Sequence, residues 1–203
     1  ALSDHPESQL PPMPELWPGA KPSPSDMLQR FQAELETLSG ELVRCATPGD
    51  AKKELAAILK EIAADRIGAV DCEDLRQLLS EVASDRIEWG EEPREPKELE
   101  SLSAGIVAAD HLLADTGSCM VAADTPHARL MCYLPPVCIV LAKMSQLRPN
   151  IQGAWDDVSR RTQSSDIRGE FVFISGPSRT ADIEKILILG VHGPKRLIVL
   201  LVG

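Results

Sequence analysis

Apolar residues in the first half of the chain recur with the period of an α-helix. Three stretches place apolar side chains at i, i+3, i+4 and i+7 or close to it, which puts them on one buried helical face. Short apolar runs separate these stretches and predict strands at residues 42–46, 67–70 and 86–89. The predicted helices bury Met27, Phe31, Leu35 and Leu38, then Leu55, Ile58, Leu59 and Ile62, then Leu75, Leu78, Leu79 and Val82.

Capping residues mark where two of these helices begin. Ser25 can cap the first helix, and Gly40 can end it. Thr47 followed by Pro48, with Asp50 in the first turn, has the composition of a helix start. Strands that alternate with helices in this way favour parallel strands joined by crossover helices.

The second half of the chain is richer in strands. One predicted strand, 196–202, is apolar at successive positions, which is typical of a central parallel strand covered on both faces. Helices are predicted at about 149–161, where Ile151, Trp155 and Val158 would be buried, and at 180–189, ending at Gly190. We therefore predict an α/β fold, a mainly parallel sheet with helices on both faces. The other strands predicted in this half are 104–109, 118–123, 137–142 and 171–175.

Composition and charge narrow the functional classes. Apolar residues make up 43% of the 203 residues, which rules out global disorder. The net charge is −10, and residues 61–100 contribute 13 acids against 5 bases. A general nucleic-acid binder needs the opposite balance. No apolar run approaches the roughly 20 residues of a membrane helix, and no secretory signal is visible, so we expect a cytoplasmic protein without a membrane span.

The cysteines and the prolines each suggest one further feature. The five cysteines lie in apolar segments without a CxxC pair, which indicates reduced, buried thiols and no metal or cofactor site. Residues 1–24 hold 7 of the 16 prolines and predict an arm, followed by a single α/β domain over 25–203. The ordinary interpretation of such an arm is disorder. Its Met13, Leu16 and Trp17 favour docking instead, on the domain or on a neighbouring copy in a homo-oligomer.

One loop has the composition of an anion site. Familiar nucleotide, hydrolase and zinc-protease signatures are absent, but residues 175–184 follow a predicted strand and precede a predicted helix. Backbone amides at Gly176, Ser178 and Thr180 could face a ligand at the helix N-terminus. Arg179 could add a forked contact to a carboxylate or phosphate.

The same loop has a purely structural interpretation. Asp182 and Glu184 already place negative charge in the first turn of the predicted helix, which would satisfy its dipole without any ligand. They would also repel a phosphate. In the functional interpretation these two carboxylates are candidate catalytic groups.

Two further segments carry polar candidates. Asp110, Asp115, Thr116 and Gly117 occupy a turn between strands, where a carboxylate could act as a general base or bind a hydroxyl, or could form an Asx turn. His192, next to Gly193, could face a cleft and act near neutral pH, or could be a structural donor. Arg129 is either an anion clamp or a side chain that extends to solvent. His127 is expected in a solvated polar turn.

Taken together, these segments resemble LUD-domain proteins, and in particular the lactate-utilisation protein C family. The resemblance covers about residues 100–203. Where the family usually has Glu-Thr-Gly-Thr, this chain has residues 115–118 with shorter side chains, and its Ser-Leu-Leu-Pro run is replaced at 132–135. The matching motifs, in order, are Gly105-Ile106-Val107 through Asp115-Thr116-Gly117-Ser118, Arg129 to Pro135-Pro136, Gly176-Pro177-Ser178-Arg179-Thr180 through Glu184, and Gly190-Val191-His192-Gly193-Pro194.

The resemblance implies a fold and a cellular role. It implies the fold of the glucosamine-phosphate isomerase, ribose-phosphate isomerase and CoA-transferase group. It also implies an accessory or regulatory component in the oxidation of L-lactate to pyruvate, beside partner proteins that carry iron–sulfur clusters. An alternative is a small-molecule-binding or enzymatic domain for a hydroxy or keto acid, an acyl-CoA or a sugar phosphate. Its polar groups would be Asp115, Asp182, Glu184 and His192. A third possibility is that the motifs are only fold-holding turns.

Overall fold

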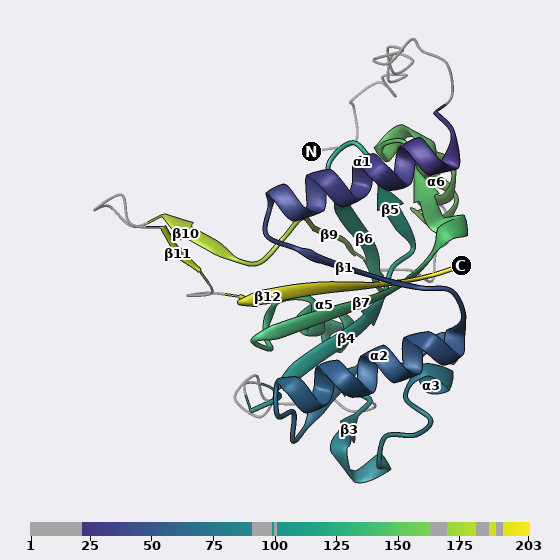
Figure 1. Ribbon diagram of the computed structural model, residues 1–203. Helices are drawn as coiled ribbons and strands as arrows, with labels where there is room; N and C mark the ends of the chain where they lie inside the picture. Colours follow the sequence, from purple (N-terminus) through teal and green to yellow (C-terminus); the bar gives the residue numbers. More distant parts are fainter. Residues whose placement is uncertain (1–21, 91–98, 100, 163–169, 182–186, 190–192) are drawn as a thin grey trace, which may run out of the picture.

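The central element of the structure, a computed structural model, is a sheet of six parallel strands in the order β1-β12-β7-β4-β2-β3 (Figure 1). Residues 22–90, 99, 101–162, 170–181, 187–189 and 193–203 are described. The strands are β1 (Glu41–Cys45), β12 (Arg196–Val202), β7 (Val137–Lys143), β4 (Ala104–Ala108), β2 (Ile67–Ala69) and β3 (Ile87–Glu88).

The apolar run at 196–202 is a central strand, as predicted. It pairs with β1 on one side and with β7 on the other, with Leu197 opposite Cys138. Residues 197 to 200 are fully buried and alternate between the two faces of the sheet. Burial on both faces explains why this strand is apolar at every position from Leu197 onwards instead of at every second one.

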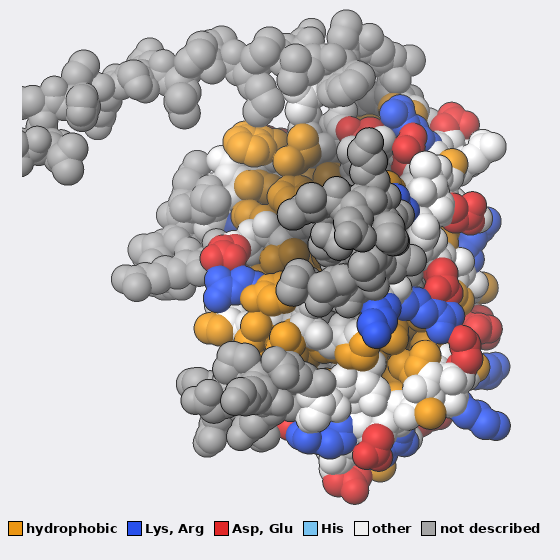
Figure 2. Space-filling view, turned by 90° about the vertical axis from the view of Figure 1, so that its left-hand side faces the viewer, with side chains coloured by type: hydrophobic (Ala, Val, Ile, Leu, Met, Phe, Trp, Pro, Cys, Tyr) orange, Lys and Arg blue, Asp and Glu red, His pale blue; other side chains and the backbone are white. Residues whose placement is uncertain are grey.

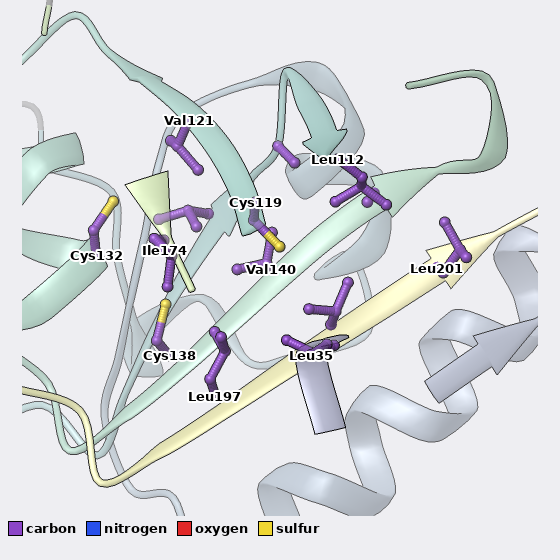
Figure 3. Close-up of a cluster of buried hydrophobic side chains, with 14 of the residues drawn as sticks. Leu35, Leu112, Cys119, Val121, Cys132, Cys138, Val140, Ile174, Leu197 and Leu201 are labelled. Carbon is purple, nitrogen blue, oxygen red and sulfur yellow. The ribbon is translucent and has the colours of Figure 1, made fainter. Parts of the chain in front are cut away.

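Helices cover one face of this sheet, and helices together with a second sheet cover the other. The second sheet has the order β8-β5-β6-β9, and its β5–β6 and β6–β9 pairs are antiparallel. Figure 3 shows side chains of both sheets meeting in one apolar cluster. On the first face lie α2 (Pro48–Glu61) and α3 (Glu73–Leu78); on the second lie α1 (Pro24–Thr37), α5 (Pro126–Tyr133), β8 (Leu147–Arg148), β5 (His111–Leu113), β6 (Ser118–Ala123) and β9 (Glu170–Ile174).

The prediction of a mainly parallel sheet with helices on both faces is confirmed, and the helix starts follow the capping residues. At α2, Thr47 accepts a hydrogen bond from the amide of Asp50, and Pro48 is the first helical residue. At α1 the cap is Ser23, in a reciprocal capping box with Asp26, and not the predicted Ser25. The proline-rich segment 1–21 lies outside the described residues.

The helix predicted over 180–189 is wrong. β10 (Arg179–Ala181) and β11 (Leu187–Leu189) form an antiparallel pair in which Thr180 is opposite Ile188. A short aliphatic run fits a strand as well as a helix, and β-branched residues such as these two favour the strand. Because residues 179–181 form a strand, the anion site expected at a helix N-terminus here loses its basis.

The segment 149–161 is helical, but two of its predicted core residues are exposed. It divides into the 3₁₀ turn η3 (Ile151–Ala154) and α6 (Trp155–Thr162). Ile151 and Trp155 are 42% and 45% exposed, whereas Ala154 is buried and packs with Leu113 and Met120. The small side chain faces the core, which a pattern of large apolar residues does not reveal. Shorter 3₁₀ turns are η1 (Ser84–Arg86) and η2 (Met144–Gln146).

Candidate functional site

Segments that carry the predicted motifs converge at the amino ends of β7 and β12. They surround a cavity of about 230 Å³, here called the motif pocket. Figure 2 looks at this end of the sheet, where hydrophobic side chains gather. The pocket is lined by Cys132, Tyr133, Cys138, Val172, Phe173, Ile174, Ser175, Gly176, Ser178, Gly193, Pro194 and Leu197.

Glycines allow the pocket loops to pack closely. Gly176 has a φ of 143°, and a Cβ there would lie 2.8 Å from the carbonyl oxygen of Leu38 at the end of α1. A Cβ on Gly193 would lie 2.8 Å from the Cβ of Ser178. The Ser178 amide donates a 2.8 Å hydrogen bond to the Pro194 carbonyl. This hydrogen bond and this close contact therefore join the Gly176-Pro177 and Gly193-Pro194 segments at the pocket.

The pocket wall offers hydroxyls and thiols, and none of its described lining residues is charged at neutral pH. The hydroxyl of Ser175 lies 2.7 Å from that of Ser118, which follows the β5–β6 turn. Burial raises the pKa of the Cys132 thiol to about 12 and that of Cys138 well above its usual range. Both thiols are therefore protonated and serve as apolar wall.

The predicted carboxylates of the β5–β6 segment do not line the motif pocket. Asp110 accepts 2.6 Å hydrogen bonds from Arg161 and from the amide of Ala122, so it joins α6 to β6. The amide of Asp115 donates to the carbonyl of Pro149, and its Oδ1 is buried without a hydrogen-bond partner among the described residues.

The turn residues beside Asp115 pack against α1. Gly117 has a φ of 62°, and a Cβ there would lie 2.3 Å from the backbone nitrogen of Leu35. The carbonyl of Thr116 accepts a 3.5 Å hydrogen bond from the hydroxyl of Ser118. Arg179 donates to the hydroxyl of Ser39, 3.1 Å away, just beyond α1. Two motif segments, those that carry Gly117 and Arg179, thus meet α1 or the turn that follows it, and neither of these residues lines the pocket.

The other predicted site residues are more scattered. Arg129 forms a 2.8 Å ion pair with Glu170 at the start of β9. Thr180 lies in β10. Of the predicted residues, Gly176, Ser178 and Gly193 line the motif pocket. Asp182, Glu184 and His192 lie outside the described residues.

Sequence reasoning missed α5 and misplaced His127. This histidine is only 8% exposed, and its Nε2 lies 3.1 Å from the carbonyl oxygen of Ala69. The prediction that it lies in a solvated turn is therefore wrong. Gly90, with a φ of 72°, packs against its ring. A signal was available, because Thr125 followed by Pro126 repeats the Thr-Pro start of α2.

Comparison with known protein families gives a match over most of the chain. The LUD domain family model matches residues 28–202. Relatives named lactate utilization protein C are 34% identical over 104 residues in Bacillus pumilus, covering 51% of this chain and 43% of the relative, and 29% identical over 119 residues in Bacillus subtilis, covering 57% and 50%. The matched segment thus spans about half the length of these relatives or less.

A solved structure shares the fold. The crystal structure of a DUF162 family protein from Deinococcus radiodurans superimposes with a TM-score of 0.69 at 18% identity. The superposition covers 90% of this chain and 99% of that chain. At this identity the likeness establishes the fold alone.

Proposed function

Because the chain belongs to the LUD domain family, we propose that it is an accessory or regulatory component of L-lactate utilisation. The observation that carries this proposal is the 34% identity over 104 residues to a protein named lactate utilization protein C. That match covers 51% of this chain. In this role the protein supports the oxidation of lactate to pyruvate chiefly through contacts with other proteins.

A growth experiment tests the role. Deletion of the gene is expected to abolish growth on L-lactate as sole carbon source and to leave growth on pyruvate unchanged. Reintroduction of the gene restores growth on lactate. Equal growth of the deletion and parent strains on lactate would exclude the role, and an equal loss on both carbon sources would point to a step after pyruvate.

The proposed partners are iron–sulfur proteins of the lactate-oxidation system. Anaerobic purification of the tagged full chain from lactate-grown cells is expected to recover proteins with iron–sulfur absorption in the visible range. Repeated purification of the chain alone would contradict this.

The arm at residues 1–24 is proposed to mediate a homo-oligomer. Its deletion is therefore expected to lower the number of copies in each assembly, calculated from the molar mass measured by light scattering.

A second candidate function is the binding of a small hydroxy or keto acid in the motif pocket. It is favoured by one observation, the convergence of three family motif segments on a single cavity. The hydroxyls of Ser175 and Ser178 can donate to a carboxylate or carbonyl oxygen. A volume of about 230 Å³ suits an acid of the size of lactate or pyruvate better than an acyl-CoA.

Thermal unfolding with L-lactate and pyruvate tests the pocket. A ligand at a hundred times its Kd stabilises by about 2.7 kcal/mol, which raises the Tm of a domain of this size by roughly 5–10 °C. Ser178→Ala is expected to reduce the shift, while Ser159→Ala on α6 serves as a control outside the pocket. An unchanged shift in Ser178→Ala would remove this hydroxyl from the site.

A further inference from the structure

A larger hollow lies at the opposite end of the six-stranded sheet, over the carboxyl ends of β7 and β12. It has a volume of about 570 Å³ and opens between α2 and α3; we refer to it as the carboxyl-end groove. None of its lining residues belongs to the family motifs. They are Pro48, Gly49, Ala51, Lys52, Asp74, Gln77, Leu78, Ser80, Glu81, Leu141, Lys143 and Val202.

The topology of the sheet explains why a hollow forms here. After β1 the chain turns to α2 on one face of the sheet, whereas after β7 it turns to η2 and β8 on the other face. β12 lies between these two strands. Adjacent connections that leave in opposite directions open a crevice at the carboxyl ends of the strands, which is where open α/β sheets bind ligands. In Figure 1 this end faces right, near the C-terminus.

The groove combines an apolar floor with charged side chains of both signs. Leu78 and Leu141 are buried, and Val202 is partly buried, so the floor is aliphatic. Lys143, at the end of β7, already has an anionic partner, since its Nζ lies 2.6 Å from Asp74 Oδ2. A second cation, Lys52 on α2, is half-buried at the edge of this floor.

Lys52 differs from Lys143 in its partner. Its Nζ donates a 2.8 Å hydrogen bond to the hydroxyl of Ser80, and no carboxylate pairs with it among the described residues. A carboxylate adds a Coulombic attraction to the ammonium group that the neutral hydroxyl of Ser80 does not supply. An anionic headgroup that replaces the Ser80 hydroxyl therefore gains free energy at Lys52 that it would not gain at Lys143.

From this geometry we propose that the carboxyl-end groove binds an aliphatic carboxylate larger than lactate. Its carboxylate contacts Lys52, and its chain lies on Leu78, Leu141 and Val202. A volume of about 570 Å³ falls within the 300–1,000 Å³ typical of ligand pockets and is far more than lactate fills. This site is independent of the motif pocket and of the role in lactate utilisation.

Gly49 provides a way to block the groove. It lines the groove at the start of α2, and a Cβ there would meet only the Thr47 hydroxyl oxygen, at 3.6 Å. Its φ is not in the left-handed region, so a side chain adds no backbone strain. Gly49→Leu is expected to fold normally and to occupy space that the ligand needs.

Calorimetric titration of the full chain with octanoate, and with octanamide as its neutral analogue, tests the proposal. We expect octanoate to bind to the wild type and to Lys53→Met, a control on the same helix whose side chain is 81% exposed and does not line the groove. Lys52→Met is expected to weaken binding about tenfold or more. Gly49→Leu is expected to abolish it, with an unchanged Tm as the check on folding.

Three results would overturn the proposal. One is the absence of octanoate binding at millimolar concentration. Another is equal affinity of the wild type and Lys52→Met, or of octanoate and octanamide, because either would show that the charge plays no part. The third is a set of amide NMR shifts at Gly176 and Gly193 instead of Gly49 and Ser80, which would place the ligand in the motif pocket.

Discussion

At the scale of single residues, two neighbours at the start of β5 hold α6 against the second sheet. Asp110 pairs with Arg161, and the Nε2 of His111 lies 3.2 Å from Asp157. His111 is buried, with 6% of its surface exposed. Sequence patterns identified Asp110 as a possible functional carboxylate. In the structure Asp110 and His111 are both partners of the same helix.

The burial of His111 makes a pH prediction possible. Desolvation lowers its pKa below the ordinary 6.5, and Arg148 and Arg161 lower it further, against the opposing effect of Asp157 and Asp110. The unfolded chain therefore binds the proton more readily. The contribution of neutral His111 to the free energy of unfolding should be complete above pH 6.5. It should be lost as the pH drops through the lowered pKa.

Urea denaturation at pH 7.5 and at pH 5.5 measures this effect, with His111→Gln as the comparison. The wild type is expected to lose more stability between the two pH values than the variant, because the other titrating groups are common to both. An equal loss in the two proteins would show that His111 titrates in the folded state as it does in the unfolded state.

At the scale of elements, local chemistry predicted some boundaries and missed others. Thr47 and Pro48 predicted the start of α2 because the cap and the fixed φ of proline act locally. The pair β10–β11 is not predicted because the run at 187–189 fits a helix as well, and its antiparallel pairing with 179–181 is what selects the strand. The glycine motifs were recognised, but their role in packing against α1 depends on tertiary contacts.

The contact between the β5–β6 turn and α1 can be tested at Gly117. Gly117→Ala is expected to lower the free energy of unfolding by about 2 kcal/mol or more, because its left-handed φ and the nearby backbone of Leu35 both oppose a Cβ. Gly49→Ala is the matched control. It has open space and a helical position, so we expect a change within about 0.5 kcal/mol or a slight gain.

Chemical denaturation of both variants gives the comparison. If Gly117→Ala were as stable as Gly49→Ala, the turn would have moved away from α1 at little cost, and the close approach would not be required for the fold.

At the scale of the whole molecule, the two sheets share a core. One buried cluster contains Val140 and Leu197 from the six-stranded sheet and Leu112 and Ile174 from the four-stranded sheet (Figure 3). The sequence predicted the parallel sheet because strands alternate with helices in the first half of the chain and the run ending at Val202 has the apolar pattern of a central strand. It did not predict the second sheet, since strands such as 118–123 are also apolar at most positions and do not reveal which sheet they join.

The described residues include no helix long and apolar enough to cross a membrane.

A shared core predicts that both sheets unfold together, as the proposed single domain over 25–203 requires. Trp89 stacks with Arg76 beside the six-stranded sheet, 5.1 Å from its guanidinium carbon to the ring centre, and Trp155 begins α6 beside the other sheet. In a Trp17→Phe background, Trp89→Phe and Trp155→Phe leave one fluorescent reporter each. Their urea midpoints are expected to coincide with each other and with the loss of circular dichroism.

Leu112→Ala then tests the coupling directly. Leu112 is fully buried in the shared cluster, so its truncation should lower the free energy of unfolding by about 2–5 kcal/mol. Because the cluster joins the two sheets, the midpoints reported by Trp89 and by Trp155 should fall by the same amount. A lower midpoint at Trp155 alone would mean that the four-stranded sheet unfolds as a separate unit.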